Sequence, residues 1–323
     1  ASFMGTTGAA MLLIRPVINT NQERKFKVHT ILFFIAVVAN AGGMLTPLGD
    51  PPLFLLYLRG APFSWFFNLL GPWLFVNTLL ILIFFIIDSY YYTKEPTTAI
   101  TRDKEQIAPI RLKGGFNFIF LTGVVLAVAF LNENYIHVIH ENHYYSFIRE
   151  GVILLMAILS LLTTNKIMRY TDNKFTWGPI VEVAFLFLGI FITMVPALLY
   201  LRENASSFGI NTPMLFYYAT GGLSAFLDNA PTAVSFHNLA LGMVGQFDAN
   251  ALMANIPEVL LKAISLGAVF FGAMTYIGNG PNFMVKAIAE ENEIDMPGFF
   301  GYIFTFSIVI LLPVYILTQI LFL

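Results

Sequence analysis

The sequence predicts an all-α polytopic membrane protein with two inverted repeats, each holding a re-entrant helical hairpin and a discontinuous transmembrane helix. Three observations support this prediction. The 323 residues are 57% hydrophobic and only 11% charged, whereas a typical soluble domain is about 25% charged. An apolar stretch is interrupted at residues 46–54 by the sequence TPLGDPPLF. A second interruption, TYIGNGPNF at residues 275–283, lies 229 residues further on.

The two interruptions are each expected to break a transmembrane helix. Proline removes a backbone donor and clashes with the preceding turn, so no continuous helix crosses either segment. At the offset of 229, residues 46, 49, 52 and 54 meet identical residues, and Asp50 meets Asn279. In lipid, an opened backbone is tolerated only where protein or a watery cavity satisfies it. Paired interruptions in two halves of a chain therefore indicate a transporter built from repeats.

The first repeat is expected to span residues 1–92. Residues 1–18 are apolar and resemble the second arm of a hairpin, with the polar sequence GTT near its tip. We expect a native N-terminal portion, with the missing first arm, to precede this segment. A broken span follows at residues 28–58. The helix predicted at residues 64–88 is long enough to cross a bilayer, because about 20 apolar residues suffice.

The remaining segments follow from apolar length and polar turns. Residues 214–245 hold two apolar arms around a polar centre, and each arm is too short to cross, so we predict a re-entrant hairpin. A cytoplasmic loop is predicted at 93–113 and scaffold helices within 114–177. The second repeat is predicted at 178–323. Besides this hairpin, it contains a crossing at 178–200, a broken helix at 257–290 and a last helix at 298–323.

Basic residues set the expected orientation. The loops 19–27, 89–113 and 165–177 hold eleven lysines or arginines, whereas the loops of the opposite side hold three. Because cytoplasmic loops are enriched in lysine and arginine, the first three loops are expected to face the cytoplasm. The first hairpin then opens from the cytoplasm and the second from outside, which makes the repeats inverted.

The two breaks form the first candidate site. Each break frees backbone carbonyls at one half-helix end, which suit a cation, and N–H groups at the other, which suit an anion. We expect Asp50, Asn279 and the backbone of Gly49 and Gly278 to take part in binding Na⁺. The alternative is a proline kink with a locally paired carboxylate.

The hairpin tips form the second candidate site. An aspartate at the centre of a membrane helix costs about 2.5–3.5 kcal/mol, so Asp228 needs a partner or an ion. The hypothesis places Na⁺ between Asp228 and the two breaks. Alternatively, the tip lies at the membrane interface and Asp228 caps the second arm. Aligning residue 1 with residue 224 places residues 5–7 (Gly-Thr-Thr) on residues 228–230 (Asp-Asn-Ala). The expected tip residues are therefore Asp228, Asn229, Thr232, Thr6 and Thr7.

Two further charged residues lie in apolar segments. Glu182 stands one turn into a predicted membrane helix, where a buried carboxylate suits reversible proton binding. It can equally complement the positive end of the helix macrodipole. Lys286 follows the second break by one turn. It either neutralises a nearby anion or extends to the membrane interface.

The sequence excludes several classes of site. It has no cysteine, which excludes disulfides, thiolate metal sites and cysteine nucleophiles. It has no nucleotide-binding loop, HExxH zinc motif or GxSxG nucleophile motif, so we predict no enzyme and no cofactor beyond Na⁺ and H⁺ as transported or coupling ions. A net charge of −2 gives no basic surface for nucleic acid.

Four segments resemble the NhaD-type sodium:proton antiporters of the ion transporter superfamily, which are close to the citrate-transporter-like proteins. They are residues 46–54, 182–184 (EVA), 226–232 (FLDNAPT) and 278–282 (GNGPN). The resemblance implies an elevator-type motion of a transport domain against a scaffold, commonly in a homodimer. We expect a multi-pass protein of the bacterial inner (plasma) membrane.

Three functions remain open, and a Na⁺/H⁺ antiporter is the first. Asp50, Asp228 and Glu182 would then bind Na⁺ and protons in alternation. In related carboxylate transporters the hairpin tips carry Ser-Asn-Thr triplets that hold substrate and Na⁺, whereas the acidic tip here would repel a dicarboxylate. The alternatives are a Na⁺-coupled citrate or dicarboxylate symporter, and a channel or non-transporting scaffold. The expected partners are the lipid bilayer, a small inorganic cation and a second copy of the chain.

Overall fold

The computed structural model describes residues 1–97, 101, 114–132, 135–136, 145, 147–172, 175–246 and 252–323. These residues are almost wholly helical. Their strands form one antiparallel ribbon, β1 (Leu252–Met253) and β2 (Ile256–Pro257). The predicted all-α class is therefore confirmed for this part of the chain, whereas most of the loop predicted at 93–113 lies outside the described residues.

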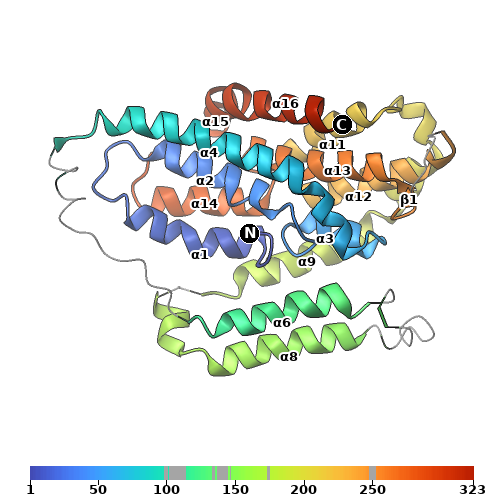
Figure 1. The fold of residues 1–323 in the computed structure, drawn as a ribbon, viewed down its shortest axis with the longest axis horizontal. Coiled ribbons are helices and arrows are strands. Elements are labelled where there is room, and N and C mark those ends of the chain that lie inside the picture. The colour runs from blue at the N-terminus through green and yellow to red at the C-terminus, as the bar shows by residue number, and fades with distance from the viewer. Residues whose placement is uncertain are drawn as a thin grey trace. The chain divides into compact units, whose positions relative to one another are not determined.

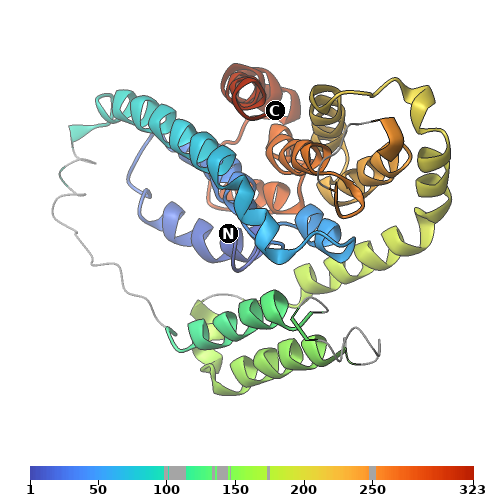
Figure 2. The ribbon, with the colours of Figure 1, turned by 45° about the vertical axis from the view of Figure 1, so that its right-hand side comes forward.

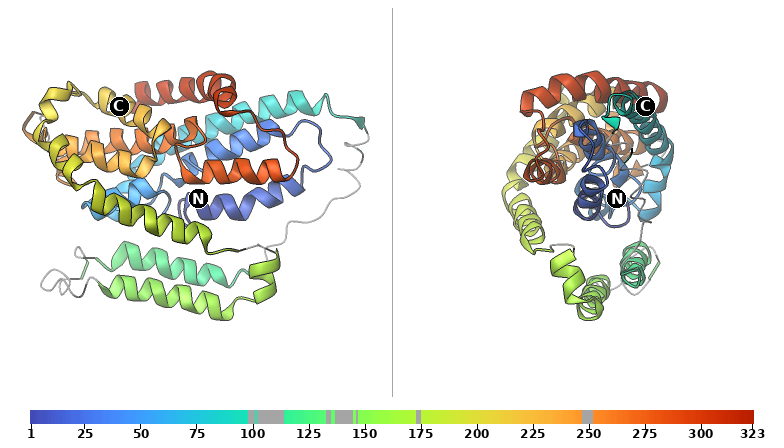
Figure 3. Two further views of the ribbon diagram at one scale, coloured as in Figure 1. Left: turned by 180° about the vertical axis from the view of Figure 1, so that it is seen from behind. Right: turned by 90° about the vertical axis from the view of Figure 1, so that its left-hand side faces the viewer.

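Two compact units divide the chain, one holding residues 1–107 and 192–323 and the other residues 108–191. The described helices of the second unit are α6 (Asn117–Phe130), α8 (Phe147–Thr163), the π-helical η4 (Met168–Asp172) and most of α9 (Gly178–Thr193). α6 and α8 lie side by side (Figure 3). The Asn117 amide oxygen links them by accepting from the hydroxyls of Ser160 and Thr164, at 2.8 and 3.0 Å.

The first unit is built from both ends of the chain. Its N-terminal elements are α1 (Thr6–Asn19), α2 (Val28–Val37), η1 (Ala41–Gly43), α3 (Pro51–Leu58), η2 (Phe63–Leu69) and α4 (Leu70–Tyr92). Its C-terminal elements are α10 (Val195–Glu203), η5 (Ala205–Phe208), α11 (Pro213–Phe226), α12 (Asn229–Leu241), η6 (Val244–Gln246), α13 (Glu258–Phe271), η7 (Gly272–Met274), α14 (Gly280–Glu291), α15 (Phe299–Tyr302), η8 (Ile303–Leu311) and α16 (Leu312–Phe322). α1 packs beside α14, and α3 packs beside α12, so the two ends interleave (Figure 1).

The core of this unit centres on α13. Most of its residues are buried, and the helix lies in the middle of its unit in Figure 2. α11 packs closely along it because Gly267 has no side chain. A Cβ atom at Gly267 would lie 2.6 Å from the carbonyl oxygen of Tyr217. The core is therefore set by close helix-on-helix packing as well as by apolar side chains.

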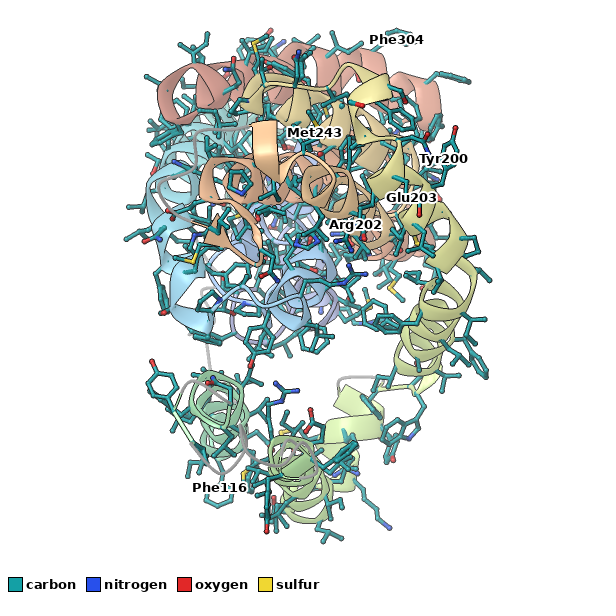
Figure 4. All side chains as sticks on the ribbon, turned by 90° about the vertical axis from the view of Figure 1, so that its right-hand side faces the viewer. Phe116, Tyr200, Arg202, Glu203, Met243 and Phe304 are labelled. Atoms are coloured by element: carbon teal, nitrogen blue, oxygen red, sulfur yellow. The ribbon has the colours of Figure 1, made fainter. Side chains whose placement is uncertain are left out.

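Two helical runs of the described chain are long and apolar enough to cross a membrane. They are Phe63–Tyr92, with 30 residues, and Phe299–Phe322, with 24 residues. Both coincide with helices that the sequence predicts. Large apolar side chains on them point outward; Phe85 is 68% exposed and Phe304 63% exposed, and Phe304 projects away from its helix in Figure 4. A large apolar surface of this kind faces lipid rather than water, so the chain is an integral membrane protein.

The predicted crossing at residues 178–200 consists of two helices rather than one. α9 ends at Thr193 and α10 begins at Val195. Pro196 stands in the first turn of α10, where its missing N–H group needs no partner, while its ring disrupts the turn before it. The two helices together remain apolar enough for a third span.

Both predicted helix breaks and the predicted hairpin connection are present. The helix is interrupted between α2 and α3, which starts at Pro51 within the first predicted interruption. It is interrupted again between α13 and α14, which starts at Gly280 within the second. In the hairpin segment, α11 and α12 contact each other and are joined by only Leu227 and Asp228. The inverted relation of the two halves stays a prediction.

Candidate ion-binding site

The residues that end the two breaks share one backbone geometry. Asp50 precedes α3 with φ −145° and ψ 142°, and Asn279 precedes α14 with φ −151° and ψ 136°. A proline follows in the first turn of each helix, where its fixed φ suits the helix and its missing N–H group is not needed. Each side chain therefore stands at the positive end of a helix.

Threonine hydroxyls anchor each break to a neighbouring segment. Thr46 Oγ1 donates to the carbonyl of Ser2, just before α1. Thr275 Oγ1 donates to the carbonyl of Ala225, near the end of α11. The two threonines are equivalent at the offset of 229. The two breaks are therefore held in place by the same kind of contact.

One glycine in each break lets the chain fold back on itself. A Cβ atom at Gly49 would lie 1.9 Å from the carbonyl oxygen of Gly43, and one at Gly278 would lie 2.6 Å from that of Gly272. Neither position has room for a side chain. The Gly49 carbonyl accepts a hydrogen bond from the backbone N–H of Thr6 at 2.8 Å, which ties the first break to the start of α1.

Asp50 is the centre of a buried hydrogen-bond cluster and is only 1% exposed. Thr6 Oγ1 donates to Oδ1 of Asp50 at 2.7 Å. Asn279 Nδ2 donates to the same oxygen at 3.1 Å, and Asn229 Nδ2 donates to Oδ2 at 2.7 Å. Four residues that the sequence nominates from four separate segments are thus brought together around one carboxylate.

The Asp50 carboxyl group has no basic partner in the cluster. Among the described residues, no lysine, arginine or histidine is paired with Asp50. Four described helices instead begin at the cluster: α1 at Thr6, α12 at Asn229, α3 directly after Asp50 and α14 directly after Asn279. Each helix start carries a partial positive charge. Neutral donors and helix dipoles therefore replace a counter-ion.

One oxygen in the cluster is unused. Asn229 is 0% exposed, and its Oδ1 has no hydrogen-bond partner. Leaving a buried acceptor unpaired costs about 1–3 kcal/mol, and amide, carboxylate and carbonyl oxygens are the ligands that hard cations take. No described group of three or more His, Cys, Asp or Glu residues could hold a metal ion. The single carboxylate suits a monovalent cation or a proton.

The other predicted residues of the second hairpin tip serve α12 itself. Asp228 Oδ1 accepts from the backbone N–H of Ala230 at 3.2 Å, and Thr232 Oγ1 donates to the Asp228 carbonyl at 2.9 Å. Asp228 therefore caps α12, which is one part of the alternative that the sequence left open. The position of this tip at the membrane interface stays a prediction. The Asp228 carboxylate is not hydrogen-bonded to Asp50, and a direct role for it in ion binding stays a prediction.

Neither Thr7 nor Lys286 is hydrogen-bonded or ion-paired to Asp50, and the side chain of Glu182 lies outside the part that the structure describes. Thr7 is half-buried and makes no hydrogen bond to Asp50, although Thr6 beside it does. Glu182 lies on α9, in the other compact unit, and its role stays a prediction. Lys286 forms an ion pair with Glu290 on its own helix, so it does not neutralise the cluster.

Two residues of the cluster were not nominated by the sequence. Asn40 follows α2 and Asn282 lies in the first turn of α14, and both are fully buried. Asn40 Oδ1 accepts from Asn279 Nδ2 at 3.1 Å. The available signal was a lone amide in the otherwise apolar run that precedes the first break, because a polar group there requires a partner.

The whole chain, residues 1–323, matches the family described as "Putative citrate transport". The chain belongs to this citrate-transport family. Membership indicates a secondary transporter of the ion transporter superfamily, which confirms the resemblance at the level of the superfamily. That the chain is not an enzyme stays a prediction, which this family supports. No curated protein and no solved structure matches the chain. The antiporter type and the transported ions stay predictions.

Proposed function

We propose that this family member is a Na⁺/H⁺ antiporter in which Asp50 binds Na⁺ and a proton in alternation. The observation that supports this function is one fully buried carboxylate contacted only by neutral donors. A negative charge taken out of water is costly, so such a group gains from a proton or from a cation. Both ligands compete for the same oxygens, and this competition is sufficient for exchange.

The proposed Na⁺ shell consists of oxygens from several segments. Asp50 contributes its carboxylate, Asn229 its unpartnered amide oxygen and Thr6 its hydroxyl oxygen. Carbonyls freed at the two breaks complete the shell. Asp228 adds negative charge beside Asn229, and Glu182 is a further proton-binding candidate. The chain would consist of two inverted repeats, and transport would follow an elevator-type motion of a transport domain against a scaffold, in a homodimer in the bacterial inner membrane.

A Na⁺-coupled citrate or dicarboxylate symporter is the second candidate. It is favoured by the family description and by the four helix starts at the cluster, because helix N-termini bind carboxylates. The charge of Asp50 already occupies these helix starts, and no basic side chain is paired with it. A second anion would therefore meet repulsion, which is why antiport is the first candidate.

The test is proton movement in proteoliposomes that hold the purified protein and an imposed pH gradient. Adding Na⁺ or Li⁺ should collapse the gradient for the wild type. Asp50→Asn should lower this response by more than about tenfold, because the neutral amide no longer exchanges a proton. The matched control is Asp295→Asn, which neutralises an exposed carboxylate of the same unit and should leave the response unchanged.

The same vesicles separate the two candidates. Uptake of labelled citrate that depends on Na⁺, without Na⁺-driven proton release, would replace antiport with symport. Activity that Asp50→Asn leaves at the wild-type level would contradict both candidates.

A further inference from the structure

Two buried asparagines join the two breaks to each other. Asn40 and Asn282 are each 0% exposed. Asn40 Nδ2 donates to Asn282 Oδ1 at 2.7 Å, across 242 residues of sequence. At the offset that aligns the breaks, Asn40 meets Val269 and Asn282 meets Leu53. This amide pair therefore has no counterpart in the other half of the chain.

Backbone carbonyls fix the orientation of both amides. Asn282 Nδ2 donates to two carbonyls of the second break, those of Gly272 and Thr275, at 2.8 and 2.9 Å. Asn40 Nδ2 also donates to the carbonyl of Ile35, at 2.9 Å. Because a carbonyl only accepts, Asn282 must present its oxygen to Asn40. For the same reason, Asn40 presents its own oxygen to the next amide.

Asn279 links Asn40 to Asp50, because its side-chain amide donates to both residues. Its Nδ2 lies 3.1 Å from each of three acceptors: Ala39 O, Asn40 Oδ1 and Asp50 Oδ1. An amide nitrogen carries two hydrogens, so none remains free. A reversed amide would set its oxygen against all three acceptors, which is strongly unfavourable. Asn279 is therefore held as a donor to the carboxylate.

We propose that Asn40 and Asn282 are positioning residues for Asp50, and that they act through Asn279 by holding its N–H group against the carboxylate. The inference rests on the proposed function of Asp50 as the ion-binding group. A donor held in place stabilises the ionised carboxylate relative to the protonated form. The amide chain of Asn282, Asn40 and Asn279 thus fixes one of the three side-chain donors that contact Asp50.

The test is an infrared pH titration of the full chain in lipid. The band of the protonated Asp50 carboxyl is identified by its absence in Asp50→Asn. Asn40→Ala and Asn282→Ala should each move the midpoint of this band to higher pH by about 0.5–1 unit, because a hydrogen bond to the charged form is weakened. The control is Asn238→Ala, which removes a buried amide bonded to Val234 O of its own helix and should not move the midpoint.

A double-mutant cycle separates positioning from general support of the fold. In an Asn279→Ala background, adding Asn40→Ala should shift the midpoint no further, because the connection to Asp50 is already lost. An additive shift in that background would overturn the proposal. So would an unchanged midpoint in a folded single variant. If Asn282→Ala does not fold, Asn282→Ser retains a donor for the backbone carbonyls and should shift the midpoint in the same direction.

The infrared readout does not depend on the transported cargo. A shifted midpoint in a protein without Na⁺-driven proton exchange would contradict antiport alone. Exchange without a shift would contradict the positioning role alone. In the exchanging protein, Asn40→Ala should also raise the apparent KM for Na⁺ several-fold while kcat stays within about twofold, as expected when binding rather than turnover is affected.

Discussion

At the scale of single residues, the distance between neighbouring backbone segments decides which positions of each break have room for a side chain. Gly49 and Gly278 lie where a Cβ atom would overlap a carbonyl oxygen, whereas a Cβ atom at Gly280 would meet nothing within 4 Å. Gly278 directly precedes Asn279, and Gly280 directly follows it as the first residue of α14. The sequence marks both as glycine, and only the folded chain distinguishes the constrained position from the free one.

We therefore expect Gly49→Ala and Gly278→Ala to destabilise the protein strongly, because the opposing atoms are backbone and cannot move aside. Thermal unfolding in detergent should show a lower Tm, or no folded protein, for both variants. Gly280→Ala is the matched control and should retain the wild-type Tm to within a few degrees. A normal Tm for Gly49→Ala would show that the first break is looser than the structure indicates.

At the scale of elements, ionic contacts fasten the turn between α1 and α2 to the end of α4. Arg24 Nη2 donates to Asp88 at 2.7 Å, and His29 Nε2 lies 2.8 Å from the same carboxylate oxygen. Glu95 accepts the backbone N–H groups of Lys25 and Phe26, both at 2.9 Å. These contacts hold the first broken span against α4.

Asp88→Asn should lower the Tm, because it leaves the mostly buried Arg24 without its closest charged partner. Removing one member of a partly buried pair typically costs about 1–3 kcal/mol. Double-mutant analysis with Arg24→Gln measures the coupling between the two side chains. The exposed control Asp295→Asn should retain the wild-type Tm. If Asp88→Asn retains it as well, the contact makes no net contribution to the free energy of unfolding.

At the scale of the whole molecule, the site is similar in backbone and unequal in charge. The two breaks share their terminal φ and ψ angles, yet one ends in Asp50 and the other in Asn279. Segments from both ends of the chain build the one unit that contains them. The hydrogen-bonded chain of Asn282, Asn40 and Asn279 is a second difference between the two halves, because it leads to Asp50 and has no counterpart in the other half.

Exchanging the two side chains tests how far this similarity extends. Asn279→Asp alone should impair transport, because it places two carboxylates within about hydrogen-bond distance of each other. The double variant Asp50→Asn, Asn279→Asp keeps one carboxylate at the centre. We expect it to recover at least about a tenth of the wild-type exchange rate, above either single variant. Recovery no greater than that of Asp50→Asn would show that the position of the charge is fixed.

The sequence by itself determined the membrane class, the places where two helices break and the polar centre at residues 224–232 that separates two helical arms. The structure narrowed the connection between these arms to Leu227 and Asp228. The features that the sequence determined depend on local causes, namely apolar length, proline and the repeated pattern of the two interruptions. The same pattern nominated Thr6, Asn229 and Asn279 as neighbours of Asp50. It also nominated Asp228 equally with them, because a polar side chain at a hairpin tip can face either the site or its own helix, and the sequence does not distinguish the two.

Only the tertiary structure decided which of these side chains meet. The Asp228 carboxylate accepts a hydrogen bond at the start of its own helix, whereas Asn40 donates one to Asn282, which lies 242 residues away in the sequence. An amide buried in an apolar segment must find a partner, but the sequence does not say which of its distant segments supplies it. The packing of two broken helices supplies it here, and the same packing leaves one carboxylate among neutral donors at the centre of the unit.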